Sequence, residues 1–166
     1  MKLHQIFDSY WEHRLKSDPT FATYIGDHRY DDKLADYSES AFNQQIETFK
    51  DFLAQSEKIN QEELSETDRV SLLIFQRIIT DGLEGAKFKP YVFPVSQQNG
   101  PHIDFPQIIS FHPFKTPKDF QNYITRLNAF PKQIDDIIAN MQKGIAESLV
   151  PAKVNIEKTI PQIQAQ

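Results

Sequence analysis

The sequence predicts an all-α fold, a multi-helix array with one long proline-rich, partly extended segment at about residues 86–117. Three observations support this prediction. Apolar residues recur at three- and four-residue spacing over several long stretches, which is the period of an amphipathic helix. Ser or Thr residues stand where such stretches begin, as helix caps do. Six of the ten prolines fall between residues 86 and 117, and proline disfavours a helix interior there.

Length and composition limit the classes of protein that remain. The 166 residues fit one domain, and we expect residues 1–166 to form a single helical domain. Thirteen Phe, six Tyr and one Trp are too many aromatic residues for a disordered chain. The net charge of −5, without a basic cluster, excludes a general nucleic-acid surface. The absence of Cys excludes disulfides, thiolate catalysis and Cys-based metal sites.

The amino terminus and the apolar runs bear on the compartment. His4, Gln5 and Asp8 interrupt the first apolar residues, so no run has the length of a signal peptide. No stretch approaches the 18 or so apolar residues that a membrane span needs. As written, the sequence predicts a cytoplasmic chain without a membrane span.

The first helix is predicted over residues 3–15, where Leu3, Phe7, Tyr10 and Trp11 share one face. Pro19 ends it, because a proline disfavours helical backbone in the residue before it. Residues 20–37 then form a polar connection rich in turn residues.

Two further helices are expected to begin after Ser38 and Ser65, which are plausible N-caps. The body of the later helix, residues 70–79, is apolar on most sides, so we expect it to be central and covered by its neighbours. Gly82 and Gly85 are expected to end it.

Residues 86–117 combine prolines with many apolar side chains. This composition predicts a fixed segment packed over the helices, with a short strand at Tyr91–Val95. A non-helical segment of this length inside a compact domain is often functional.

The next helix is expected to begin after Thr116, with Pro117 as its first residue. Its apolar stripe continues in register beyond Pro131, so either one long helix bends there or a second helix starts. A last helix is predicted after Pro151, and its pattern has no terminating residue before the chain stops, as in a fragment of a longer protein.

Sequence motifs for catalysis are missing: the chain has no zinc-peptidase His-Glu-x-x-His, no serine-hydrolase elbow and no phosphate or dinucleotide loop. We therefore name no catalytic residue, no metal ligand and no cofactor on this chain. His4, Asp8 and Glu12 share a helix face, but a solvated polar face explains them better than a metal site.

A polar turn at residues 96–100 lies between the apolar prolines. Its amides could bind a peptide backbone or a small polar ligand. A plain surface turn at Asn99-Gly100 is the simpler interpretation.

Several stretches together resemble the amino-terminal part of a bacterial family called domain of unknown function 885. The order and spacing of the similar stretches run through essentially the whole chain: Tyr10-Trp11, Asp18–Thr23, Gly26–Asp32, Pro94–Pro101, Ile108–Phe114, Tyr123–Leu127, Gly144-Ile145 and Val150-Pro151.

The resemblance implies a longer, all-helical protein similar to gluzincin-type zinc metallopeptidases. Zinc and the catalytic residues would belong to its carboxy-terminal half, and many relatives begin with a secretory or lipoprotein signal. The present chain would be a non-catalytic region that forms part of the wall of the substrate cleft and has that catalytic half and a peptide substrate as partners. The residues expected to line the cleft are Gln98, Asn99, Gly100, His102, Phe111 and His112.

A second hypothesis comes from another class. The chain could be a stand-alone helical module that binds a peptide or a partner through the aromatic-rich segment.

Overall fold

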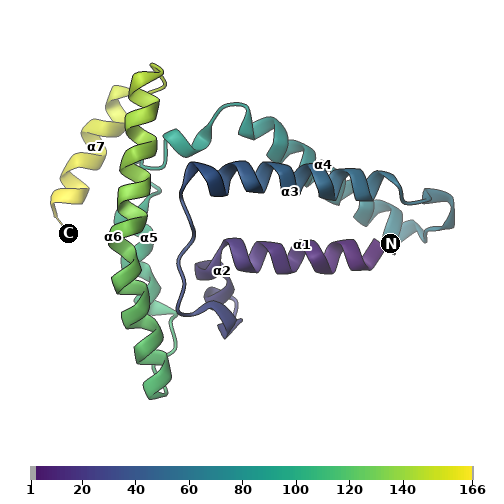
Figure 1. The fold of residues 1–166 in the computed structure, drawn as a ribbon, viewed down its shortest axis with the longest axis horizontal. Helices are drawn as coiled ribbons and strands as arrows, with labels where there is room; N and C mark the ends of the chain where they lie inside the picture. Colours follow the sequence, from purple (N-terminus) through teal and green to yellow (C-terminus); the bar gives the residue numbers. More distant parts are fainter. Residues whose placement is uncertain (1–2, 166) are drawn as a thin grey trace. The chain divides into compact units, whose positions relative to one another are not determined.

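The computed structural model describes residues 3–165, and most of these residues lie in α-helices (Figure 1). In this range it has seven α-helices, four short 3₁₀ turns and no strand, which confirms the predicted all-α class. Within the described residues, no helix combines the length and the apolar character that crossing a bilayer requires.

The chain divides into two compact units. The first unit contains the chain up to Arg14 together with Ser40–Lys89, and the second contains Leu15–Glu39 and the described residues from Pro90 onward. That residues 1–166 behave as one domain stays a prediction.

The elements fall into the two units as follows. The first unit holds most of α1 (Leu3–Ser17), α3 (Glu39–Glu57), the 3₁₀ turn Gln61–Glu63 and α4 (Glu66–Ala86). The second unit holds α2 (Pro19–Tyr24), α5 (Pro101–Gln107), α6 (Pro117–Ala146), α7 (Lys153–Gln164) and the 3₁₀ turns His28–Tyr30, Pro90–Val92 and Ile108–Ser110.

The core of the first unit is aromatic and aliphatic, built from Ile6, Phe52, Phe75 and Ile79. Tyr10 packs edge-on against Phe75, with ring centroids 5.3 Å apart. Such T-shaped pairs add stability beyond their buried area because ring edges and faces carry opposite partial charges.

Two expectations for α4 were wrong. Gly82 does not end the helix, which continues to Ala86. A Cβ at Gly82 would lie 2.6 Å from the Phe49 ring, so this glycine allows α3 and α4 to approach closely. The helix is also covered on one face only: Leu72 and Ile79 are buried, while the opposite face exposes Val70, Leu73, Ile74 and Ile78.

The connection predicted over residues 20–37 is partly helical. Asp18 caps α2, since its Oδ1 accepts a hydrogen bond from the Phe21 N–H at 3.0 Å. Pro19 both separates α2 from α1 and starts α2, because proline is well tolerated in the first helical turn.

The proline-rich segment also differs from the expectation. It has no strand at Tyr91–Val95; Pro90 instead begins a 3₁₀ turn, and Pro101 begins α5. Proline at such first positions loses no helical hydrogen bond. The segment is therefore extended or looped at residues 93–100 and 112–116 and helical between them.

The helix predicted from Thr116 is α6, one continuous helix through Pro131. A capping box fixes its start: the Asp119 N–H donates to Thr116 Oγ1 at 3.3 Å, and the Thr116 N–H donates to Asp119 Oδ2 at 2.8 Å.

The second unit is centred on one buried cation of α6, Arg126, which has no solvent exposure. Its Nε donates to the Lys33 carbonyl at 2.9 Å, and its Nη2 donates to the carbonyls of Pro19 and Tyr30, both at 3.1 Å. Nη2 also donates to Thr23 Oγ1 at 2.6 Å. One side chain thus fixes residues 19–33 against α6.

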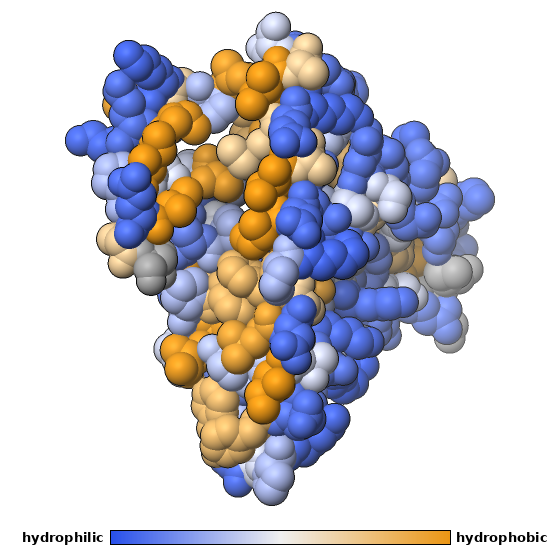
Figure 2. All heavy atoms as spheres, turned by 60° about the vertical axis from the view of Figure 1, so that its left-hand side comes forward, coloured by the Kyte–Doolittle hydropathy of each residue, from blue (hydrophilic) through white to orange (hydrophobic). Residues whose placement is uncertain are grey.

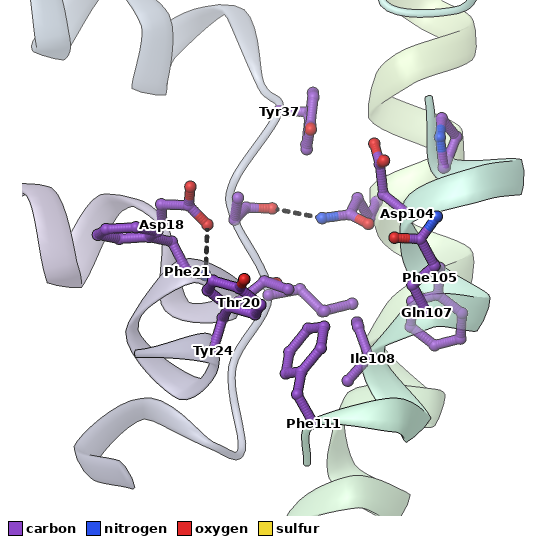
Figure 3. Close-up of a pocket in the computed structure, with 14 residues that line it drawn as sticks. Asp18, Thr20, Phe21, Tyr24, Tyr37, Asp104, Phe105, Gln107, Ile108 and Phe111 are labelled. Carbon is purple, nitrogen blue, oxygen red and sulfur yellow. Dashed lines mark hydrogen bonds between the residues drawn. The ribbon is translucent and has the colours of Figure 1, made fainter. Parts of the chain in front are cut away.

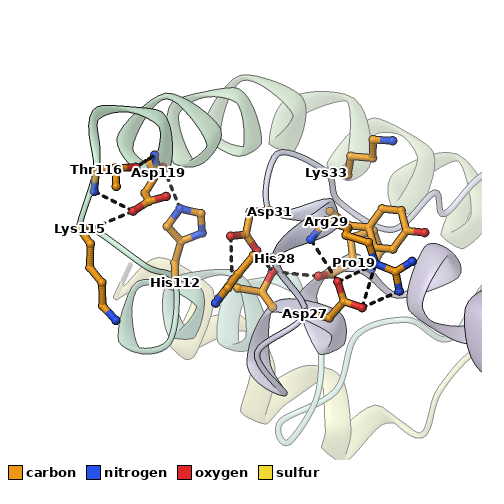
Figure 4. Close-up of polar contacts among 12 residues, drawn as sticks. Pro19, Asp27, His28, Arg29, Asp31, Lys33, His112, Lys115, Thr116 and Asp119 are labelled. Carbon is orange, nitrogen blue, oxygen red and sulfur yellow. Dashed lines mark hydrogen bonds and ion pairs between the residues drawn. The ribbon is translucent and has the colours of Figure 1, made fainter.

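The Thr23 hydroxyl connects the positive charge of Arg126 to the negative charge of the Asp31 carboxylate. Thr23 Oγ1 accepts from the guanidinium and donates to the buried Asp31 carboxylate at 2.7 Å. Burial lowers the pKa of Arg126, while the negative charges of Asp31 and Asp32 act in the opposite direction. His28 pairs with the second oxygen of Asp31 at 3.0 Å (Figure 4).

His112 provides a further acceptor for the guanidinium of Arg126. Its Nδ1 lies 3.1 Å from Arg126 Nη1. Its Nε2 lies 2.9 Å from the Asp119 carbonyl oxygen (Figure 4). Because a guanidinium only donates, Nδ1 accepts and Nε2 carries the proton. His112 therefore links the start of α6 to Arg126.

The first prediction concerns Arg126. Arg126→Met removes the shared donor and leaves several buried acceptors unpaired, so we expect the free energy of unfolding to fall by about 3–5 kcal/mol. Arg77→Met is the control, because the Arg77 side chain is 78% exposed and pairs with Asp81 across one helical turn. We expect a change below about 0.5 kcal/mol there. Urea unfolding followed by circular dichroism measures both. A loss below about 1 kcal/mol in Arg126→Met would contradict the assigned role.

The second prediction concerns pH. The backbone N–H of Thr116, followed by that of Lys115, lowers the pKa of Asp119 from 3.8. A carboxylate with a lowered folded-state pKa contributes stability above its ordinary pKa and loses it as the pH falls through the folded value. Asp119→Asn should therefore destabilise the chain at neutral pH, and the difference from the wild type should shrink below pH 3.8.

Unfolding curves at stepwise lower pH measure this difference. Asp135→Asn removes a charge from the same helix without touching the cap and serves as the control. A difference between Asp119→Asn and the wild type that is constant over this pH range would contradict the prediction.

Candidate functional site

The candidate site is a hollow of about 390 Å³ that lies wholly in the second unit. Its walls come from α2, from residues 34–37, from α5 with the following 3₁₀ turn, and from Gln133 of α6 (Figure 3). The aromatic side chains that line it are Phe21, Tyr24, Tyr37, Phe105 and Phe111.

The α2 wall follows from the Arg126 network. Pro19 and Thr23 lie four residues apart, on the helix face that contacts Arg126, and both are buried. The other side of α2 therefore presents Phe21 and Tyr24 to the hollow.

The wall of residues 34–37 is fixed by two amide side chains of α6. Gln133 Nε2 donates to the Ala35 carbonyl at 2.8 Å, and Asn140 Nδ2 donates to the Tyr37 carbonyl at 2.6 Å. Gln133 lies seven residues from both Arg126 and Asn140, so the three side chains form one line along the helix.

The third wall starts at Gly100, whose φ of +135° is unfavourable for other residues. The Gly100 N–H donates to Asp104 Oδ2 at 3.2 Å, which holds that carboxylate at the start of α5. Phe111 packs edge-on against Tyr24, with centroids 5.5 Å apart, and so joins this wall to α2.

Two carboxylates, Asp18 and Asp104, lie on opposite sides of the hollow (Figure 3). Tyr37 lies at the end of the hollow where these two carboxylates are found. Partial burial raises the pKa of the Tyr37 phenol, and the negative charges of Asp104 and then Asp18 raise it further. The electrostatic field of both carboxylates thus reaches Tyr37.

The chemical groups of the hollow suit binding. It offers aromatic surfaces, two carboxylates and the amides of Gln107 and Gln133, a composition typical of small-ligand sites. Among residues 3–165, no three His, Asp or Glu side chains come together in a way that could hold a metal ion. His4, considered above for a metal, pairs instead with Asp68 at 3.2 Å.

Of the six residues predicted to line a cleft, Phe111 lines the hollow. His112 is buried and bound to Arg126 and Asp119.

The other four lie in and after the predicted turn. Gln98 and Asn99 are exposed, and their backbone N–H groups donate to Ser96 Oγ at 3.2 and 3.1 Å. Gly100 is buried, and the two ring nitrogens of His102 are enclosed without a hydrogen-bond partner among the described residues. The structure therefore does not gather the six around one space.

The sequence did not predict that side chains from residues 18–37 would line the hollow. The sequence predicts a helix end at Pro19, beside Asp18, and a connection over residues 20–37 that includes Tyr24 and Tyr37. A usable signal was Asp18-Pro19, which is both a helix end and a capped helix start. No local pattern shows that residues 18–37 face α5.

Comparison with known proteins confirms the family that the sequence resembles. No curated protein matches the chain. A family model described as a bacterial protein of unknown function, DUF885, matches residues 19–166, and the chain belongs to this family.

Proposed function

We propose that this chain is a non-catalytic helical region of a zinc-metallopeptidase-like protein and that its second unit forms part of the wall of a substrate cleft. Catalysis would belong to a separate carboxy-terminal half of the parent protein. The proposal assigns no zinc ligand and no catalytic step to the present chain.

An exposed apolar stripe on α6 carries the proposal. Phe120, Ile124, Leu127, Ile138 and Ile145 are between 43% and 66% exposed. Figure 2 shows apolar side chains gathered along this face of the molecule. Monomeric proteins rarely leave such a continuous apolar surface open to water, and one this long is typical of an interaction site.

The spacing of the stripe indicates what covers it. Together with Pro131, Ile134 and Met141, the stripe residues follow one another at alternating intervals of four and three. This seven-residue period is that of helices which pack side by side. We therefore propose that helices of the catalytic half pack on the stripe.

The hollow supports the cleft-wall part of the proposal. It holds Phe111, one of the residues expected to contact substrate, and its volume of about 390 Å³ is at the small end of ligand pockets. A space of this size fits one or two residues of a peptide.

The alternative, a stand-alone module that binds a peptide or partner, is favoured by one observation: every residue that lines the hollow belongs to the second unit of this chain. The mass of the native polypeptide discriminates between the two proposals.

The third prediction is that an antibody against residues 1–166 detects a native polypeptide several times heavier than 19.3 kDa. That product should hydrolyse peptides in a zinc-dependent way. A native band at 19.3 kDa would overturn the metallopeptidase proposal and favour the stand-alone module.

The fourth prediction tests the stripe in the isolated chain. Leu127→Glu with Ile138→Glu replaces two exposed apolar side chains by charges. Each apolar side chain contributes on the order of 1 kcal/mol when covered, so self-association should weaken at least about tenfold. Sedimentation and the fluorescence of a hydrophobic dye measure this.

Thr125→Glu with Ala139→Glu is the matched control, since it adds the same charges to exposed positions of the same helix outside the stripe. Equal self-association in both double variants would contradict a role of the stripe in packing.

A further inference from the structure

The hollow has a charge pattern that the cleft-wall role does not explain. Its two carboxylates, Asp18 and Asp104, are accompanied by aromatic rings, and none of the described residues that line it is Lys, Arg or His. Binding an apolar group does not require two carboxylates in the lining of a pocket.

The hydrogen bonds of the two carboxylates leave them able to bind a ligand. Asp18 uses Oδ1 for the Phe21 N–H, and Asp104 uses Oδ2 for the Gly100 N–H. Both residues are exposed, so their remaining oxygens are accessible to a ligand.

The aromatic residues add a second attraction for positive charge. Tyr24 and Phe111 meet edge to face at 5.5 Å, and both line the hollow. A cation near an aromatic face is attracted by the negative charge of the π system. Aromatic faces and carboxylates together therefore favour a cationic ligand.

Other ligand classes fit this lining less well. A carboxylate, such as the carboxyl terminus of a peptide, would be repelled by both Asp18 and Asp104. An apolar side chain would displace water from the two carboxylates without replacing its hydrogen bonds. The volume of about 390 Å³ excludes a folded partner.

We propose that the hollow between α2 and α5 binds the cationic group of a peptide, an ammonium or a guanidinium, between Asp18 and Asp104 and against the rings of Tyr24 and Phe111. This inference rests on the proposed function and specifies the class of substrate residue that the cleft wall recognises. The two sources of positive charge in a peptide are its amino-terminal ammonium and an arginine or lysine side chain.

The test is titration of the full chain with three tripeptides, all amidated at the carboxyl terminus and followed by isothermal calorimetry. The first is Ala-Arg-Ala, the second is the same peptide acetylated at its amino terminus, and the third is the acetylated peptide with citrulline, the neutral isostere of arginine. We expect the third peptide, which has neither the terminal ammonium nor the guanidinium, to bind at least about tenfold more weakly than Ala-Arg-Ala. Binding should also weaken as the salt concentration rises.

The three peptides distinguish the two sources. Loss of affinity on acetylation identifies the terminal ammonium as the bound group. Retention on acetylation, followed by loss with citrulline, identifies the guanidinium.

Conservative variants test the two carboxylates. Asp18→Asn and Asp104→Asn each keep an oxygen for the backbone N–H, so the fold should remain, and each should weaken the cationic peptides about three- to tenfold. Asp51→Asn, at an exposed carboxylate of α3, is the control and should leave affinity unchanged.

Two outcomes would overturn the inference, and they differ in what they imply. If all three peptides bind equally and Phe111→Ala abolishes binding, the hollow binds peptide without selecting charge, and the cleft-wall proposal stands. If no peptide binds, or if Phe111→Ala leaves binding unchanged, the hollow is not a peptide site, and the cleft-wall proposal fails with it.

Discussion

The second unit depends on one buried guanidinium. Arg126 has no exposed surface, and an arginine stays charged at any ordinary pH, so every one of its donors must find an acceptor inside the protein. The acceptors come from two regions that are far apart in the sequence, residues 19–33 and His112. A fold that failed to bring them together would leave a bare charge in its interior, at a cost of several kcal/mol.

The same constraint extends along α6 and builds a wall of the hollow. Arg126, Gln133 and Asn140 are spaced by seven residues, and they donate to the carbonyls of Lys33, Ala35 and Tyr37 respectively. Carbonyls at alternate residues of an extended segment point to the same side. A line of polar side chains on a helix therefore holds a segment that has no regular hydrogen-bonded structure of its own.

Sequence reasoning predicted the long helices well, because their start signals and apolar periods are local. Ser65 and Thr116 cap α4 and α6 as expected. The predictions were wrong where one proline has two roles. Pro19 and Pro101 were expected only to interrupt helical structure, whereas each is also the first residue of a helix. Gly82 was interpreted as a helix end, whereas the close Phe49 ring requires it.

The candidate site was harder to predict than the fold, for a physical reason. Phe111 lines the hollow, and the segment that contains it stands out in the sequence by its unusual composition. The positions of Asp18 and Tyr37 are not predictable locally, because they depend on Arg126 and Asn140, which lie about a hundred residues further along the chain. The available signal was an arginine within one helical turn of the aromatic residues Tyr123 and Phe130, since an arginine is buried only where it finds many acceptors.

The two sides of α6 connect these observations. One side carries the polar line of Arg126, Gln133 and Asn140, and another carries the exposed stripe that includes Leu127 and Ile138. A helix with its side chains is only about 10–12 Å across. Whatever covers the stripe therefore lies one helix diameter from Gln133, which lines the hollow. One helix therefore carries both the proposed packing surface and part of the wall of the hollow, and Arg126 holds that helix against residues 19–33.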